Sequence, residues 1–273
     1  MHFGDILVYL DHTASGKSRM ALALDLAGRS NAQVTGYYFA PRNSPALAGA
    51  FGSAVADFID PPQATPTENA ALDFERELEL HDLHGTWIRG NYSNTVHDIA
   101  KHSRCVDLVI AGLGDVDDPD AEESAIDIEE LVIECGRPVL GIPIAATARN
   151  VGTRILVAWD GSREASRAVH DAFPFLREAK AVYVVSLDRD QVGVASADDV
   201  MSHLKRIGID AAIDDQLDLR LPIGEEILSR IEANDIDLLV AGAFGHSRRV
   251  EHITGGASRS LLHQMIVPVL VSH

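Results

Sequence analysis

Closely spaced glycines near the end of the chain could bring the backbone into contact with a phosphate group. The segment at 241–262 reads AGAFGHSRRVEHITGGASRSLL, and its glycines are Gly242, Gly245, Gly255 and Gly256. An apolar, strand-like run precedes them, and we expect a helix to begin near Ser258. Glycines allow close backbone approach, and the free N–H groups at a helix start attract an anion. The segment therefore predicts a phosphate-binding loop.

Basic side chains surround this loop, although the chain as a whole is acidic. The formal net charge is −18 over 273 residues. Around the loop, Glu251 is the single acid beside His246, Arg248, Arg249, His252 and Arg259. The local excess of basic groups favours an anionic ligand, while the overall charge argues against nucleic acids and anionic membranes as partners.

A second pattern near the N-terminus is a near match to the P-loop, GxxxxGK[ST]. The segment ILVYLDHTASGKS at 6–18 has Asp11 at the position of the first glycine. A carboxylate there would occupy the place of the phosphate. We therefore interpret the GKS triplet as the first turn of a helix, capped by Thr13 or Ser15, with Lys17 in solvent.

Three sequence blocks occur twice in the same order, which indicates an internal duplication. The paired blocks are 6–11 with 155–160, 107–112 with 237–242, and 137–143 with 267–273. The first copy is longer because of a Pro-, Ala- and Gly-rich excursion at 41–70. We predict two domains, an N-terminal half (1–147) and a C-terminal half (151–273), joined near Ala145–Thr153.

Each copy alternates strands and helices, which predicts an α/β fold with two tandem, doubly wound, five-stranded parallel sheets. In the second copy we expect strands at 154–160, 181–188, 209–218, 236–243 and 267–273, and helices at 162–178, 197–208, 224–235 and 258–265. The charged amphipathic stretch 72–80 is expected to be a packing helix. Ligands of such sheets bind at the carboxyl ends of the strands, where Asp11, Asp160, Gly112 and Gly242 lie.

Two strands ending in Asp, a G-2x-G-9x-G loop and a final VPVLV strand together resemble the universal stress protein family in its tandem form. The resemblance covers nearly the whole chain. It implies an adenine-nucleotide alpha-hydrolase-like sheet of order 3-2-1-4-5 in each copy. It further implies a pseudo-dimer paired through the last strands and, in one branch of the family, ATP binding.

Carried over to this chain, the resemblance gives each site residue a role. Asp160 would contact the ribose, and Ala158 and Leu187 would flank the adenine. The phosphates would be held by Gly242, Gly245, Gly255 and the helix start at Ser258. Gly256 departs from the pattern, which has Ser or Thr there. The lost hydroxyl contact would weaken binding by up to about tenfold without abolishing it.

The N-terminal copy lacks the equivalent loop. The positions of Gly245, Gly255 and Gly256 are held by Asp115, Ala125 and Ile126. After Gly112 and through Glu130 there are nine carboxylates and neither Lys nor Arg. Such a loop would repel a triphosphate, so we expect this half to have lost its nucleotide site.

These features predict a cytoplasmic universal stress protein, since MHFGDILVYL resembles no signal peptide. It would bind an adenine nucleotide, ATP with or without Mg²⁺, in the C-terminal half alone and signal to an unknown protein partner. The internal pseudo-dimer could also form a homodimer. No catalytic residue and no metal-ligand set can be nominated. Two alternatives stay open: weak ATP hydrolysis or self-phosphorylation on Thr254 or Ser258, and a stress scaffold that binds no nucleotide.

Overall fold

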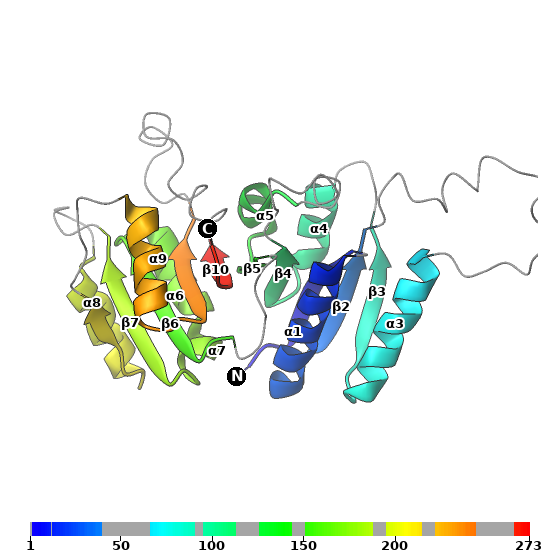
Figure 1. Ribbon diagram of the computed structural model, residues 1–273, viewed down its shortest axis with the longest axis horizontal. Helices are drawn as coiled ribbons and strands as arrows, with labels where there is room; N and C mark the ends of the chain where they lie inside the picture. The colour runs from blue at the N-terminus through cyan, green and yellow to red at the C-terminus, as the bar shows by residue number, and fades with distance from the viewer. Residues whose placement is uncertain are drawn as a thin grey trace, which may run out of the picture.

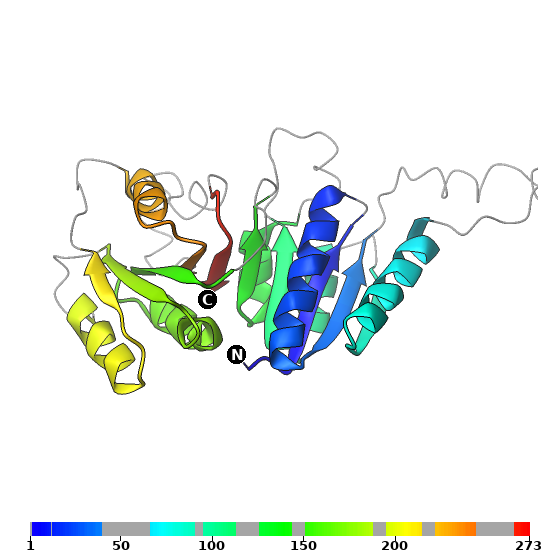
Figure 2. The same ribbon diagram turned by 60° about the horizontal axis from the view of Figure 1, so that its bottom comes forward.

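The computed structural model describes nine stretches of the chain, and the account below is confined to them. They are residues 2–11, 13–39, 66–90, 95–112, 126–143, 151–187, 195–214, 222–243 and 265–273. Strands and helices alternate along both halves, and the helices lie on both faces of a central sheet (Figures 1 and 2).

The N-terminal half contributes five strands and four helices within these stretches. They are β1 (Asp5–Leu10), α1 (Ala14–Ser30), β2 (Gln33–Tyr38), α3 (Pro66–Leu80), β3 (Gly85–Arg89), α4 (Thr95–Ser103), β4 (Leu108–Gly112), α5 (Ile128–Cys135) and β5 (Val139–Ile142). The predicted packing helix at 72–80 is confirmed as part of α3, whose Phe74 and Leu78 are buried. However, α3 begins at Pro66, inside the excursion predicted at 41–70. Proline is compatible with the first position of a helix, because an N–H group at that position would have no hydrogen-bond partner within the helix.

The C-terminal half repeats the alternation. Its elements are β6 (Arg154–Trp159), α6 (Arg163–Asp171), α7 (Phe173–Leu176), β7 (Ala181–Ser186), α8 (Ala197–Arg206), β8 (Ala212–Asp214), α9 (Ile223–Ala233), β9 (Leu238–Gly242) and β10 (Val269–Ser272). The single helix predicted at 162–178 is wrong. It divides into α6 and α7 because Pro174 lacks the N–H that a continuous helix requires. The helix predicted at 258–265 and the part of the predicted strand 209–218 beyond Asp214 lie outside the described residues.

The ten strands of the described stretches form one continuous sheet, in which the two predicted five-stranded sets are joined edge to edge. Its order is β3-β2-β1-β4-β5-β10-β9-β6-β7-β8, so each half has the order 3-2-1-4-5 counted within itself. The pairs within each half are parallel, whereas β10 and β5 pair antiparallel, with Leu270 opposite Leu140. The halves therefore join through their last strands, near the middle of the molecule (Figure 1).

Two hydrophobic cores fill the space between the sheet and its helices. One lies under α1, α3, α6, α7 and α8, and the other under α4, α5 and α9. Side chains of β1 alternate between them, because successive strand residues point to opposite faces: Val8 enters the first core and Tyr9 the second. At the carboxyl end of a strand, neighbouring residues therefore point to opposite faces of the sheet.

The near P-loop sequence forms a helix start, as predicted. Thr13 is the N-cap of α1, and its hydroxyl accepts from the Gly16 N–H at 3.1 Å. Lys17 is exposed on the first turn. Ser15 does not cap the helix; its hydroxyl accepts a hydrogen bond from Arg19 at 2.9 Å. None of the helices in the described stretches is both long and apolar enough to cross a membrane.

Candidate nucleotide site

The described part of the predicted site lies at the carboxyl ends of β6, β7 and β9. Four predicted residues are found there: Ala158, Asp160, Leu187 and Gly242. In the sheet register Ala158 pairs with Ala241 on one side and Val185 on the other. The Leu187 N–H donates to the Trp159 carbonyl at 2.8 Å. The remaining predicted residues, Gly245, Gly255, Gly256 and Ser258, lie outside the described residues.

A tight turn fixes Asp160 between β6 and α6. Its Oδ1 accepts from the Ser162 N–H at 2.9 Å and from the Ser162 hydroxyl at 2.6 Å. The Ser162 hydroxyl in turn accepts from the Ala165 N–H at 3.1 Å and caps α6. Gly161 has φ of 73°, a conformation that favours glycine. The turn therefore holds the Asp160 carboxylate rigidly at the end of the strand.

Gly242 allows α6 to touch the end of β9. A Cβ atom at this position would lie 2.4 Å from the Ala165 nitrogen and 2.6 Å from the Glu164 carbonyl carbon. The first turn of α6 thus packs directly against the strand end, and its positive dipole end lies at the same edge as Asp160. Gly242 is required for this close packing whether or not it also contacts a phosphate.

One negative charge, Glu164, is buried in this first turn. Burial raises the pKa of the Glu164 carboxyl group. Hydrogen bonds from the Arg163 side chain and from the backbone N–H of Glu164 itself lower the pKa by more, so it lies below the ordinary value. The Arg163 Nε atom lies 2.5 Å from Glu164 Oε1. The guanidinium therefore offsets a carboxylate that would otherwise oppose an anionic ligand.

The corresponding place in the N-terminal half is closed by an ion pair. Asp11, the counterpart of Asp160, accepts from the Thr13 N–H at 2.9 Å and from the Thr13 hydroxyl through the same oxygen. Its other oxygen lies 2.5 Å from Arg19 Nη2. The two side chains are only 3% and 4% exposed, so this is a buried ion pair.

The Arg19 guanidinium fills the space between the ends of β1 and β4. Its Nε donates to the Tyr9 carbonyl at 2.9 Å, and its carbon lies 5.3 Å from the centre of the Tyr9 ring. A Cβ atom on Gly112 would lie 2.5 Å from Arg19 Nη1. The guanidinium therefore occupies the space beside the Asp11 carboxylate at this edge of the sheet.

Aromatic side chains occupy the region that corresponds to the predicted adenine position. Tyr9 stands where the C-terminal half has Ala158, and Phe39 corresponds to Leu187, since each donates its N–H to the last residue of the neighbouring strand. Tyr9 is 2% exposed, and burial, together with the Asp11 carboxylate, raises the pKa of its hydroxyl. We call Tyr9 and Arg19 the plug of the N-terminal half.

Sequence reasoning missed the plug, although the signal was available. The offset of 149 that aligns Asp11 with Asp160 also aligns Tyr9 with Ala158 and Arg19 with Ala168. Two alanines thus stand where the N-terminal half has a large aromatic ring and a guanidinium. In the described stretches, no three His, Cys, Asp or Glu side chains gather to bind a metal ion.

Comparison with known proteins supports a universal stress protein domain in the C-terminal half. Residues 152–273 match the model of the Universal stress protein family. No curated protein matches the chain.

Solved structures match almost the whole chain. A universal stress protein from Archaeoglobus fulgidus has a TM-score of 0.68 at 14% identity, over 98% of this chain and 95% of that one. A functionally unknown protein from Pseudomonas aeruginosa PAO1 has a TM-score of 0.63 at 15% identity, over 99% and 92%. The cytoplasmic domain of a prokaryotic cation chloride cotransporter has a TM-score of 0.51 at 12% identity, over 98% and 94%. At these identities the likeness shows the fold alone.

Proposed function

We propose that this chain is a tandem universal stress protein that binds one adenine nucleotide, ATP with or without Mg²⁺, in its C-terminal half. The domain match to residues 152–273 supports the family. The N-terminal half would serve as a partner domain without a nucleotide site of its own. Binding would be regulatory, with occupancy read by a protein partner in the cytoplasm.

The observation that carries this proposal is the difference between the two strand ends. Arg19 reaches Asp11 and Tyr9 fills the adjoining space in one half. The other half has Ala168 and Ala158 at those positions, and an alanine side chain supplies neither a cation nor a ring. A ligand with a sugar hydroxyl and a planar base would complement the positions that the plug fills in the N-terminal half.

Each described residue then has a physical task. Asp160, fixed by the Ser162 turn, would accept hydrogen bonds from the ribose hydroxyl groups. Ala158 and Leu187 would border the base. Gly242 leads directly into the predicted phosphate loop, and the first turn of α6 packs against it, so the positive end of this helix would favour a phosphate group beside Gly242.

The antiparallel pairing of β5 with β10 suggests how occupancy could be transmitted. In the continuous sheet β10 lies between β9, which leads into the predicted phosphate loop, and β5 of the N-terminal half. We regard the halves as an internal pseudo-dimer, with one ligand-binding member and one plugged member. A partner protein would distinguish the two occupancy states through the predicted phosphate loop.

Thermal unfolding of nucleotide-stripped protein with ATP and Mg²⁺, compared with GTP, tests the proposal. At a hundred times the dissociation constant, a ligand stabilises the folded state by about 2.7 kcal/mol. We expect a rise in melting temperature with ATP that Gly245→Asp abolishes, since this change imitates Asp115 of the N-terminal half. Gly28→Asp, a change of equal charge on α1 where the glycine has open space, controls for charge.

Other outcomes would decide between the alternatives. If ATP raises the melting temperature of neither the wild type nor the Gly28→Asp variant, the scaffold without nucleotide is the better account. If the wild type releases phosphate from ATP and the Gly245→Asp variant does not, the alternative of weak ATP hydrolysis is the better account.

A further inference from the structure

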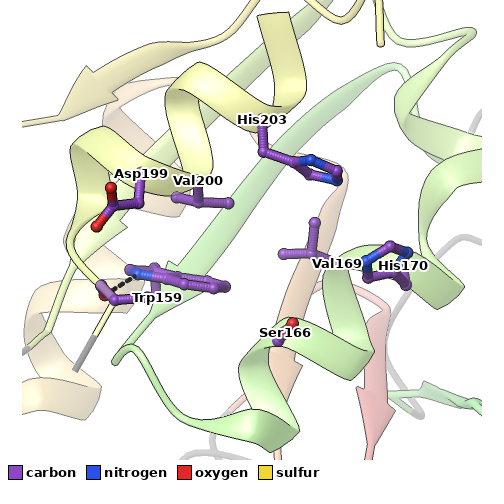
Figure 3. A pocket seen from close by; sticks show the side chains of 8 residues that line it. Trp159, Ser166, Val169, His170, Asp199, Val200 and His203 are labelled. Atoms are coloured by element: carbon purple, nitrogen blue, oxygen red, sulfur yellow. Dashed lines mark hydrogen bonds between the residues drawn. The ribbon is translucent and has the colours of Figure 1, made fainter. Parts of the chain in front are cut away.

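A pocket lies between α6 and α8 in the C-terminal half, beside Trp159 at the end of β6 (Figure 3). Its volume is about 220 Å³. The side chains that matter for its chemistry are Trp159, Ser166, Val169, His170, Val200 and His203. Trp159 forms one end, the two histidines stand at the other, and the valines lie between them (Figure 3).

The Trp159 end of the pocket is rigid. The indole Nε1 donates to the Ala195 carbonyl at 2.9 Å, which commits the polar edge of the ring. Trp159 is 5% exposed. A fixed indole ring favours a planar partner, because stacked or tilted aromatic pairs contribute more binding free energy than the burial of their apolar area alone provides.

The histidine end carries an unsatisfied polar atom. His203 Nε2 is buried and has no hydrogen-bond partner among the described residues. Leaving such an atom unpaired is costly, so a ligand that pairs with it gains specificity. The His203 ring centre lies 5.5 Å from that of His170, and the His170 ring centre lies 4.7 Å from that of Phe173, so aromatic groups border this end.

The charges of the lining argue for an uncharged ligand. Neither Lys nor Arg lines the pocket, so an anion would find no counter-charge. The one carboxylate, Asp199, accepts from the Ser196 N–H at 2.9 Å and the Ser196 hydroxyl at 2.8 Å. These bonds form the capping box of α8 and tie this carboxylate to the helix start.

We propose that this pocket binds an uncharged planar heteroaromatic molecule of one or two fused rings. Its ring packs between Trp159, Val169 and Val200, and a ring N–H or hydroxyl donates to His203 Nε2. An imidazole nitrogen accepts in this way in the tautomer that carries its proton on the other ring nitrogen, here Nδ1. The site differs from the proposed nucleotide site in its lining and its charge, and it does not depend on that site being occupied.

Fluorine NMR of the full chain labelled with 5-fluorotryptophan provides the test, with indole as the probe. The chain has two tryptophans, and Trp87 packs against Tyr38 and Phe74 in the N-terminal half. Indole should shift the Trp159 resonance in a saturable manner and leave the Trp87 resonance in place as an internal control. A Trp159 resonance that does not move at millimolar indole would overturn the proposal.

Two variants localise the binding. Ser166→Phe fills the pocket and should abolish the Trp159 shift, while Ser202→Phe, on the exposed surface of α8, should retain it. Saturable binding that survives Ser166→Phe would place indole elsewhere and contradict the site. The dispersion of the two resonances reports whether each variant is folded.

A second probe tests the hydrogen bond itself. Benzothiophene matches indole in shape but lacks the ring N–H, so we expect the wild type to bind it about two- to tenfold more weakly. In His203→Phe, which keeps an aromatic ring but no acceptor, this preference should disappear. An equal preference in both proteins would overturn the assignment of His203, even if Ser166→Phe had failed to fold.

Discussion

The two halves of this protein end their first strand in the same way but fill the space beside it differently. Asp11 and Asp160 are both held by the residue that caps the following helix, Thr13 in one case and Ser162 in the other. Behind Asp11 stand the Arg19 guanidinium and the Tyr9 ring. The comparison indicates that the same strand, turn and helix start can be kept in both halves while different side chains fill the space beside the aspartate.

The glycines that follow show the same division. Gly112 lies against the Arg19 side chain, whereas Gly242 lies against the backbone of the first turn of α6. A Cβ atom would be crowded at both positions, but by different neighbours. At Gly112 the lack of a side chain leaves room for Arg19, and at Gly242 it lets the first turn of α6 approach the end of β9.

The largest expected effect is the loss of the plug cation. Arg19→Ala should lower the free energy of unfolding by about 3–5 kcal/mol, because it leaves the buried Asp11 carboxylate without its counter-ion. Urea denaturation measures this. Arg29→Ala is the matched control, since the Arg29–Glu178 pair is about one-third exposed and should contribute at most about 1 kcal/mol. Equal losses in the two variants would show that Asp11 does not depend on Arg19.

Next in size is the transfer of the plug to the C-terminal half. The double variant Ala158→Tyr/Ala168→Arg should weaken ATP binding by at least about a hundredfold, about 2.7 kcal/mol, since it recreates the Tyr9 and Arg19 arrangement beside Asp160. Competition with a fluorescent ATP analogue gives the affinity. Ala233→Arg, at the exposed end of α9, controls for the added charge. Undiminished binding in a folded double variant would place the nucleotide elsewhere.

A smaller effect is expected where α6 meets β9. Gly242→Ala should cost about 1–3 kcal/mol of stability, because the new Cβ would force the first turn of α6 away from the strand. Gly28→Ala makes the same exchange inside α1, where nothing lies within 4 Å of the new atom. This control should be neutral or stabilise by up to about 1 kcal/mol. The prediction fails if Gly242→Ala is as stable as Gly28→Ala.

The smallest effect concerns a pair of aspartates that anchor the first strand of each half. Asp237 accepts from the N–H groups of Gly152, Thr153 and Arg154, while Asp107 accepts from Gly4 and Asp5. Burial raises the pKa of Asp237 above 3.8 despite these bonds. The folded state therefore holds this proton more tightly than the unfolded chain does, so the associated stability is present at low pH and is lost as pH rises through the folded pKa.

The Asp237→Asn variant imitates the protonated side chain, so its stability should not fall as pH rises through the folded pKa of Asp237. The difference in melting temperature, wild type minus Asp237→Asn, should fall as pH rises from about 3 to about 6. Asp107→Asn, at the exposed counterpart, controls for the hydrogen bonds themselves. A difference that rises over this range would show that the hydrogen bonds, and not burial, dominate at Asp237.

Much of the fold could be predicted from the sequence because the repeats fix it. The two copies of the strand ending in Asp locate β1 and β6, and alternation along the chain predicts the parallel pairing within each half. The Thr13 cap followed from the preference of helix starts for hydroxyl side chains. The pairing of the halves through their last strands came from the family resemblance alone. The alternation within one copy does not predict it, since it depends on contacts between residues 130 positions apart, such as Leu140 and Leu270.

The candidate site was predictable only in part. Motif spacing points to Asp160 and Gly242, but what fills the space around them depends on side chains from α1 and α6 that no motif covers. Composition suggested that the acidic segment after Gly112 closes the N-terminal half. The structure adds Tyr9 and Arg19, which lie directly beside Asp11. The pocket at Trp159 was beyond prediction because Ser166 and His203 meet only after α6 and α8 have packed.

The central claim is that the chain holds one nucleotide and that it binds in the C-terminal half. Calorimetric titration of ATP with Mg²⁺ into nucleotide-stripped protein tests this most directly, because it measures the number of sites as well as the affinity. The account predicts one mole of ATP per mole of chain in the wild type and none in Ala158→Tyr/Ala168→Arg. Two moles of ATP per mole of chain would show that Tyr9 and Arg19 do not prevent binding in the N-terminal half. No binding at all would show that Ala158 and Ala168 do not provide a nucleotide site in the C-terminal half.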